Sequence, residues 1–408
     1  MWKFIDALIK KKKRKNKRYL KDIFFLLFYV IINYIKSGDI MIYLDYAANT
    51  PVDKKVLKVF NSATKKYIAN PNSNHPLGLK AKNEIDKSLE VISKYFKTNK
   101  ENVIITSGSS ESNNLVIKGI CERYKEKGKH IIISSIEHSS IVAPSNYLTT
   151  LGYEVTVLPL DKNGKVDLKE LEKSIRKDTI LVSITSVDSE LGIVQPIEKI
   201  GKMLKEKGIV FHTDATQAIG KVNINFKDVD FITFAPHKFY GLNGVGVLIN
   251  RNDIKITPLI HGGKSTTIYR SGTPMTANII ACSKALELAT TNIDKRNKYI
   301  KKLKDYLLEE LSKLDFVHIN STKDSIPSTL NFSLINKSSK EVVDFLYKKG
   351  ICVSTQSACS LGTAPSKSVM ALTNDKNLAE NSIRISLSHL TKKKEINEFL
   401  KEFIEACK

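Results

Sequence analysis

Short β-branched runs alternate with helical patterns between about residues 100 and 250, and this alternation constrains the fold more than any other feature. Runs such as "NVIITS", "HIIISS" and "TILVSITSV" are apolar almost throughout, and amphipathic segments such as "DLKELEKSIRK" separate them. Continuous apolar strands joined by amphipathic helices are typical of a mostly parallel sheet that is covered on both faces. The sequence therefore predicts an α/β fold whose ligands bind at the carboxyl ends of the strands.

The pattern changes beyond about residue 275. A long helical stretch over 277–314 leads into the shorter strand-like runs "STLNFSL", "ICVST" and "SIRISLS" and a closing helix. We expect a second, smaller α+β lobe here. The predicted organisation is an N-terminal extension (1–40), a segment that packs with the small domain (41–55), a large domain (56–262) and a small C-terminal domain (263–408).

Positive charge is concentrated at the N-terminus. The chain has 65 Lys and Arg against 42 Asp and Glu, a net charge of +23, and residues 1–40 hold eleven basic and three acidic side chains, which gives +8. No aromatic-studded basic ribbon is present elsewhere, so direct nucleic-acid binding is not expected. The apolar run 23–35 is shorter than the ~20 residues of a membrane-spanning helix. We favour an accessory extension, or an upstream start that is not used, over membrane contact or organelle targeting.

The cysteines indicate a reducing compartment. The chain has five, an odd number with wide spacings and no C-x-x-C pair. This pattern argues against a disulfide framework and against a structural metal site, and we expect a cytoplasmic protein without bound metal. Cys121 and Cys282 fall in helical patterns and Cys352 on a strand, so these three are expected to pack in the core. Cys407 is expected at a frayed terminus.

The side chains that follow the predicted strands form a set suited to pyridoxal 5'-phosphate (PLP). Lys238 follows the buried run "VDFITFA", where lost hydration lowers the pKa of the amine and frees it to form a Schiff base. Asp214 can pair with the pyridine nitrogen, Gln217 can reach the ring hydroxyl, and His138 offers a flat ring. The helix start "TSGSSESNN" suits a phosphate. Each feature alone has a commoner structural explanation, so the prediction depends on their joint occurrence.

With these residues assembled, the chain resembles the cysteine desulfurases of the class V aminotransferase group from about Ile42 to the C-terminus. The matching stretches include "YLDYAANTP", "TSGSSESNN", "TDATQAIGK", "APHKFYGLNGVG" and "STQSACS". The resemblance implies a fold-type-I PLP-dependent transferase with a seven-stranded sheet. It also implies that sulfur is removed from L-cysteine, which gives L-alanine and a persulfide on Cys359. The sulfur would pass to an acceptor protein for Fe–S cluster assembly or tRNA thiolation.

The resemblance also implies a role for each site residue. The catalytic residues that it implies are Lys238, Cys359 and His138. Lys238 would bind the cofactor covalently and move the α-proton, His138 would stack on the ring, and Cys359 would attack the substrate sulfur as a thiolate. Arg384 would clamp the substrate carboxylate with its planar fork. The residues implied for cofactor binding are Ser109, Ser110, His138, Asp214, Gln217, His237, Lys238 and Thr273, with Thr273 supplied by the second subunit of a homodimer.

Two departures from the family pattern concern binding contacts. Ser189 stands where the family often has an Asn that contacts cofactor or substrate. Ala235 stands where a phosphate-binding Ser is common, so one hydrogen bond of ~1 kcal/mol is expected to be missing.

The alternatives to a cysteine desulfurase are another class V PLP enzyme, namely a selenocysteine lyase or an aminotransferase, and a non-enzymatic scaffold. An aminotransferase has no need of Cys359, and the presence of Lys238 and Asp214 argues against a scaffold.

Overall fold

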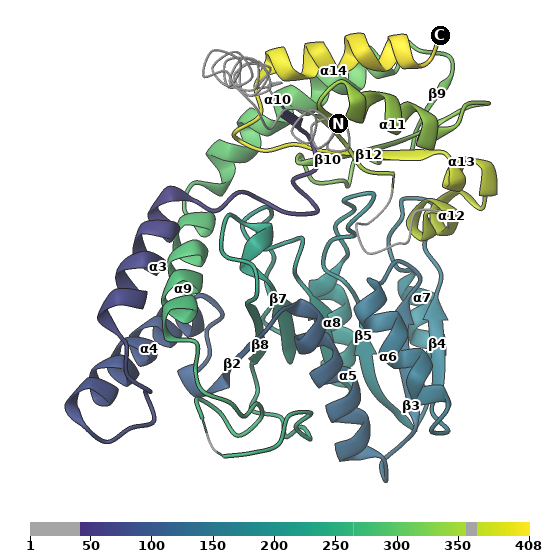
Figure 1. The fold of residues 1–408 in the computed structure, drawn as a ribbon. Helices are drawn as coiled ribbons and strands as arrows, with labels where there is room; N and C mark the ends of the chain where they lie inside the picture. Colours follow the sequence, from purple (N-terminus) through teal and green to yellow (C-terminus); the bar gives the residue numbers. More distant parts are fainter. Residues whose placement is uncertain (1–40, 264, 356–364) are drawn as a thin grey trace, which may run out of the picture. The chain divides into compact units, whose positions relative to one another are not determined.

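The predicted apolar runs assemble into one seven-stranded sheet (Figure 1). The computed structural model describes residues 41–263, 265–355 and 365–408. The order in the sheet is β2-β8-β7-β6-β5-β3-β4, and every neighbouring pair is parallel except those that β8 makes with β2 and β7. The mostly parallel α/β sheet is therefore confirmed. The strands are β2 (Val103–Thr106), β3 (His130–Ser134), β4 (Glu154–Leu158), β5 (Thr179–Ser183), β6 (Val210–Asp214), β7 (Phe231–Phe234) and β8 (Gly246–Asn250).

Helices cover both faces of this sheet, as its apolar strands require. Alternate residues of β3 show the two faces: Ile132 packs in one hydrophobic cluster, whereas Ile131 and Ile133 pack in the other. Helix α8 contributes to the first cluster and helix α5 to the second. The helices that follow strands of the sheet are α5 (Ser109–Tyr124), α6 (Ser139–Thr149), α7 (Leu168–Ser174) and α8 (Ile197–Glu206).

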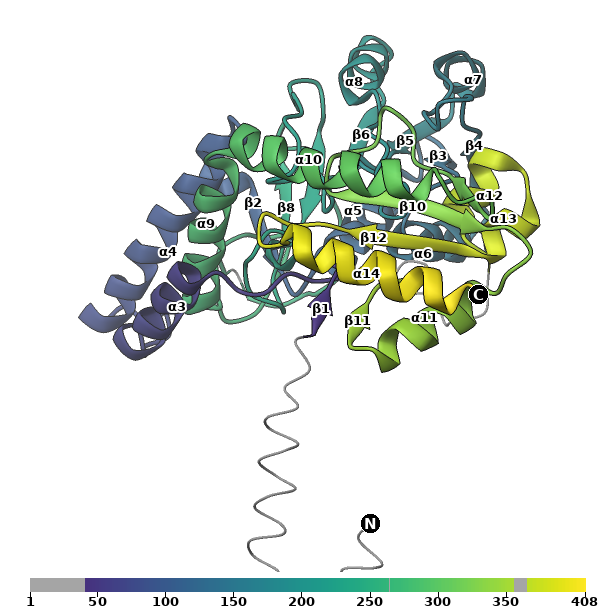
Figure 2. The same cartoon turned by 90° about the horizontal axis from the view of Figure 1, so that it is seen from above.

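The predicted helical stretch over 277–314 is two helices, α9 (Thr276–Thr290) and α10 (Ile293–Leu311). Asn292 separates them because its backbone adopts a left-handed conformation, with φ 64°, which a continuous helix does not accept. Helix α9 lies beside α3 (Lys54–Lys66) and α4 (Pro76–Tyr95), as Figures 1 and 2 show. A short 3₁₀ turn, η1 (Lys100–Asn102), lies between α4 and β2 in the chain.

The C-terminal part contains a three-stranded antiparallel sheet of order β12-β10-β9. Helices α10, α11 and α14 lie on the side of this sheet that faces away from the seven-stranded one (Figures 1 and 2). The predicted smaller α+β lobe is thus present. Its elements are β9 (Val317–Ile319), β10 (Thr329–Leu334), α11 (Ser339–Lys348), β11 (Ile351–Cys352), α12 (Lys367–Thr373), α13 (Lys376–Glu380), β12 (Ser382–Ser386) and α14 (Lys393–Ala406).

The N-terminal stretch of the described residues connects both lobes. After β1 (Ile42–Tyr43), the N–H of Leu44 donates to the carbonyl of Cys352. A few residues later, the N–H of Thr50 donates to the carbonyl of His237 in the large lobe. The predicted extension 1–40 lies outside the described residues. No helix in the described ranges combines the length and the apolarity that a membrane span needs.

The cysteine predictions are partly wrong. Cys121 and Cys282 are buried as expected, and burial raises the pKa of each thiol to about 12, so both are inert. Cys352 is only half-buried, and it ends β11, a strand of only two residues. Cys407 is buried rather than frayed, since α14 runs almost to the end of the chain and its C-cap residue is Cys407 itself.

Candidate active site

A cavity of about 180 Å³ lies at the carboxyl ends of the central strands. We call it the Lys238 cavity. Polar side chains reach it because parallel strands end at a common edge of the sheet, where the loops that follow them converge. It is lined by nine of the eleven predicted site residues, which are Ser109, Ser110, His138, Ser189, Asp214, Gln217, His237, Lys238 and Arg384.

Lys238 ends the 3₁₀ turn η2 (Pro236–Lys238), which follows the buried strand β7. Its Nζ donates to the backbone carbonyls of Ala47 and Ala48, at 2.9 and 2.6 Å. Carbonyl dipoles at this distance offset the cost of holding an amine away from bulk water. The N-terminal stretch "YLDYAANTP" therefore contributes directly to the environment of the lysine.

Asp214 ends β6 and presents a carboxylate whose two oxygens both accept hydrogen bonds. The N–H of Thr216 donates to Oδ1 at 2.9 Å, and Nδ2 of Asn113 donates to Oδ2 at 2.8 Å. These two hydrogen bonds hold the carboxylate in one orientation beside the Lys238 cavity, which Asp214 lines. Asn113, on α5, also donates to Ser140 Oγ at 2.8 Å. Asn113 was not among the predicted site residues, although it lies within the motif "TSGSSESNN".

His138 is the N-cap residue of α6, and its Nδ1 accepts the capping hydrogen bond. The backbone N–H of Ser140 donates to this nitrogen at 3.1 Å. Because a backbone N–H can only donate, Nδ1 is the unprotonated nitrogen of the neutral ring. Burial lowers the pKa of His138, and burial with the neighbouring Lys238 lowers the pKa of His237 to about 4. Both imidazoles are therefore neutral near pH 7.

The N-terminus of the 16-residue helix α5 opens into the Lys238 cavity at Ser109 and Ser110. Its N-cap residue is Gly108, which offers no side-chain acceptor to the first N–H groups of the helix. Gly246 packs against this residue, and a Cβ at that position would lie 2.2 Å from the carbonyl carbon of Gly108. The arrangement leaves room for an anion at the helix N-terminus.

Arg384, on β12, is 1% exposed and faces the Lys238 cavity from the small lobe. Its Nη2 donates to Asp45 Oδ1 at 2.7 Å, and its Nη1 donates to the carbonyl of Ser189 at 3.0 Å. Its Nε is buried without an acceptor among the described residues. Ser189 thus meets Arg384 through its backbone. Asp45 was not among the predicted site residues, although it lies within the motif "YLDYAANTP".

The two remaining predicted site residues are Thr273 and Cys359. Thr273 is exposed on the segment between β8 and α9 and does not line the Lys238 cavity of its own chain. Since it was predicted to act in the partner subunit, that role stays a prediction. Cys359 lies outside the described residues. Among the described residues, Ser354 exchanges backbone hydrogen bonds with Arg384 at 2.6 and 3.2 Å.

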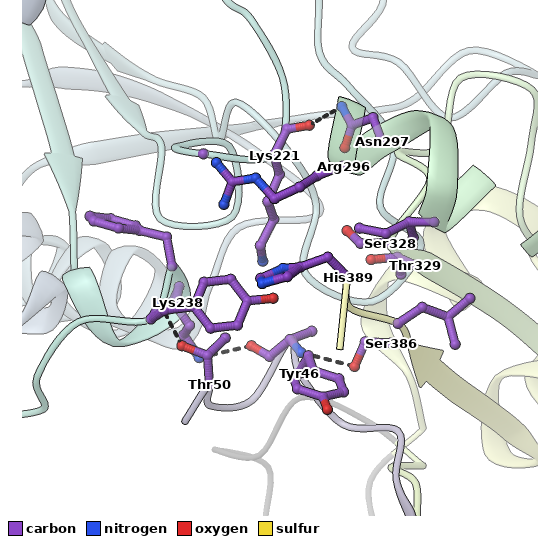
Figure 3. Close-up of a pocket in the computed structure, with 16 residues that line it drawn as sticks. Tyr46, Thr50, Lys221, Lys238, Arg296, Asn297, Ser328, Thr329, Ser386 and His389 are labelled. Carbon is purple, nitrogen blue, oxygen red and sulfur yellow. Dashed lines mark hydrogen bonds between the residues drawn. The ribbon is translucent and has the colours of Figure 1, made fainter. Parts of the chain in front are cut away.

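Lys238 also lines a second, smaller cavity of about 30 Å³. The other residues around this cavity include Tyr46, Lys221, Arg296 and His389 (Figure 3). We call it the Lys221 cavity. Lys221 was not among the predicted site residues, although it ends the motif "TDATQAIGK". Burial and the charges of Lys238 and Arg384 lower its pKa to about 7. In the described ranges, no group of three or more His, Cys, Asp or Glu is arranged to hold a metal.

The comparisons with known proteins agree on one family. The family model described as aminotransferase class-V matches residues 42–399. A cysteine desulfurase IscS of Dictyoglomus turgidum is 40% identical over 361 residues, which cover 87% of this chain and 92% of the relative. A mitochondrial cysteine desulfurase of Arabidopsis thaliana is 37% identical over 365 residues, which cover 88% of this chain and 80% of the relative.

Solved structures give the same result. A NifS-like protein superposes with a TM-score of 0.84 at 33% identity, covering 90% of this chain and 98% of that one. The structure of SspA in complex with cysteine matches with a TM-score of 0.75 at 32% identity, and the match covers 86% of this chain and 99% of that one. The likeness therefore extends over both lobes of the described structure.

Proposed function

This chain belongs to the aminotransferase class-V family and is a cysteine desulfurase, and we propose that it works with PLP held in the Lys238 cavity. The observation that carries the proposal is the convergence of Lys238, Asp214, His138 and Arg384 on one cavity. Relatives at 36–40% identity over most of the chain carry the name of this activity.

The residues around the cavity fit PLP. The uncapped N-terminus of α5 suits the phosphate, and the hydrogen-bonded carboxyl group of Asp214 suits the pyridine nitrogen. His138 offers a neutral ring face, and Lys238 supplies the amine. When bound, PLP supplies an electron sink for the charge that develops at the substrate α-carbon.

Residues of the chain would bind the substrate, move its α-proton and hold the cofactor. Arg384 would bind the carboxylate of L-cysteine, and its buried Nε, which has no acceptor among the described residues, is available for this contact. Lys238 Nζ, next to the carbonyls of Ala47 and Ala48, would take the α-proton. Asp214 would keep the pyridine nitrogen protonated. Ser109, Ser110 and His237 would hold the phosphate.

Cys359 would carry the sulfur. Its thiolate attacks the sulfur of the substrate, so that a sulfur–sulfur bond forms while the substrate carbon–sulfur bond breaks. The carbon fragment leaves as L-alanine after protonation, and Cys359 keeps the persulfide. An acceptor protein, for Fe–S cluster assembly or tRNA thiolation, would then take the sulfur. We also propose a homodimer in which Thr273 completes the partner's site, and a cytoplasmic location, which suits the free thiols.

Two substitutions test the proposal. Lys238→Ala should abolish both alanine formation and the visible absorbance of lysine-bound PLP, because both need the amine. Cys359→Ala should abolish sulfide release but keep that absorbance. Cys352→Ala is the matched control, a half-buried thiol seven residues away in sequence, and should change neither. Undiminished alanine formation by Lys238→Ala would contradict the proposal.

A further inference from the structure

The amide of Gln217 is held from both sides by groups that determine its orientation. Lys221 Nζ donates to Gln217 Oε1 at 2.5 Å, and Gln217 Nε2 donates to the carbonyl of Ala47 at 2.9 Å. The carbonyl of Ala47 can only accept, so it identifies Nε2, and the protonated form of Lys221 can only donate, so it agrees on which end of the amide is oxygen. The second hydrogen of Nε2 remains for a ligand in the Lys238 cavity, which Gln217 lines.

We propose that Lys221 is a positioning residue, which orients the amide of Gln217 so that its Nε2 donates to the ring oxygen of PLP. The inference rests on the proposed function, because it concerns the same cofactor. Without Lys221 the amide could rotate and present Oε1 to the ring oxygen, and two acceptors would then face each other.

The surroundings of Lys221 favour this role over simple packing. Lys238 and Arg384 disfavour its positive charge, and Arg296 and His389 line the same cavity (Figure 3). A purely structural side chain at this position gains nothing from a charge that its neighbours oppose. The negative charges of bound PLP would offset that cost and keep Lys221 protonated.

The backbone of Lys221 is also fixed. Nδ2 of Asn297, on α10, donates to its carbonyl at 2.8 Å (Figure 3). Gln217 and Lys221 lie four residues apart on the turns after β6, so the lysine reaches back along its own segment. The sequence spacing thus provides the contact that fixes the amide.

A double-mutant cycle on PLP affinity tests the inference. The PLP-free protein is titrated with PLP, and the dissociation constant is read from the visible absorbance. K221M and Q217A should each weaken binding about tenfold, as the loss of one hydrogen bond to a charged group predicts. The double variant should be no weaker than Q217A alone, within about twofold. K205M removes an exposed lysine on α8 and should change nothing.

Two further variants separate orientation from folding. Q217E keeps an acceptor for Lys221 but loses the donor, so it should bind PLP as weakly as Q217A. K221R keeps a cationic donor and should bind within about threefold of wild type. If K221M does not fold, Q217E and K221R test the inference without it. Weaker PLP binding by K221R than by Q217E would overturn the inference. Additive effects of K221M and Q217A would overturn it while the proposed function stands. A wild type that takes up no PLP would overturn both.

Discussion

The two ends of the seven-stranded sheet carry charged residues in contrasting environments. At the carboxyl ends, Arg384 is 1% exposed and pairs with Asp45, which is 18% exposed. At the amino ends of β5 and β6, a larger cavity of about 670 Å³ is rimmed by Arg176, Lys177 and Lys207. Arg176 there is 38% exposed, and its partners are more exposed still. The size of a cavity and the charge around it therefore do not identify the active site. Charged side chains that are buried and hydrogen-bonded to partners do identify it.

The energetic consequence differs between the two ends. Exposed ion pairs contribute about 0–1 kcal/mol because water and salt screen them. Removing one partner of a buried pair costs about 3–5 kcal/mol, because an uncompensated charge is left behind. Substitutions at the carboxyl ends should thus be severe, and those at the amino ends mild.

Asp214→Asn should have the largest effect. The amide preserves the size of the side chain but removes the charge that would keep the pyridine nitrogen protonated. Alanine formation should fall about 10³-fold, as expected when the main electrostatic support of proton transfer is lost. PLP uptake, followed by visible absorbance, should persist, and so should folding, followed by circular dichroism. Activity within threefold of wild type would remove Asp214 from the mechanism.

Arg384→Lys should come next. Lysine keeps the positive charge but lacks the planar fork that reaches Asp45 and the carbonyl of Ser189 together. The KM for L-cysteine should rise about 10–100-fold, which corresponds to one or two charge-assisted hydrogen bonds. The kcat should fall less. Steady-state alanine formation measures both constants, and an unchanged KM would place the substrate carboxylate elsewhere.

The sequence predicted the sheet and most of this site because its signals are local. Apolar runs identify the strands, and the residue after each strand must lie at the sheet edge, which was sufficient for Asp214 and Lys238. Contacts between distant segments were not predictable in this way. Asp45 meets Arg384 across 339 residues, and Asn113 meets Asp214 across 101. Only the folded chain brings such pairs together, so their roles were missed although their motifs were quoted.

Asp188→Asn should have a smaller effect that depends on pH. Asp188 is 2% exposed, and its carboxylate accepts from Ser368 Oγ at 2.7 Å and from the N–H of Glu190 at 3.1 Å. Burial and the charge of Glu190 raise its pKa from 3.8 to about 6. The folded state therefore holds this proton more tightly than the unfolded state, and the free energy of unfolding falls as the pH rises from about 4 to 6.

Asparagine removes that cost, since its oxygen can accept from the backbone while its NH₂ donates to Ser368. Urea unfolding should find Asp188→Asn about 1–2 kcal/mol more stable than wild type above the pKa of Asp188, and equal to it well below. Ser321→Ala removes a part-buried hydroxyl that accepts from the N–H of Asn331 but does not titrate, so it should not show this pH dependence. A stability difference that is the same at all pH values would mean that Asp188 does not titrate in the folded state.

Arg176→Ala should have the smallest effect, although Arg176 pairs with both Glu154 and Asp178. Its guanidinium makes more ionic contacts than that of Arg384, so a simple count of ion pairs predicts the larger loss here. Solvent exposure predicts the opposite, because each of these pairs is screened and the freed carboxylates return to water. The free energy of unfolding should stay within experimental error of wild type, and the difference should be smaller again in high salt. Alanine formation should not change. A loss of stability as large as that expected for a buried ion pair would show that partner number outweighs burial at this end of the sheet, and the contrast between the two ends would no longer hold.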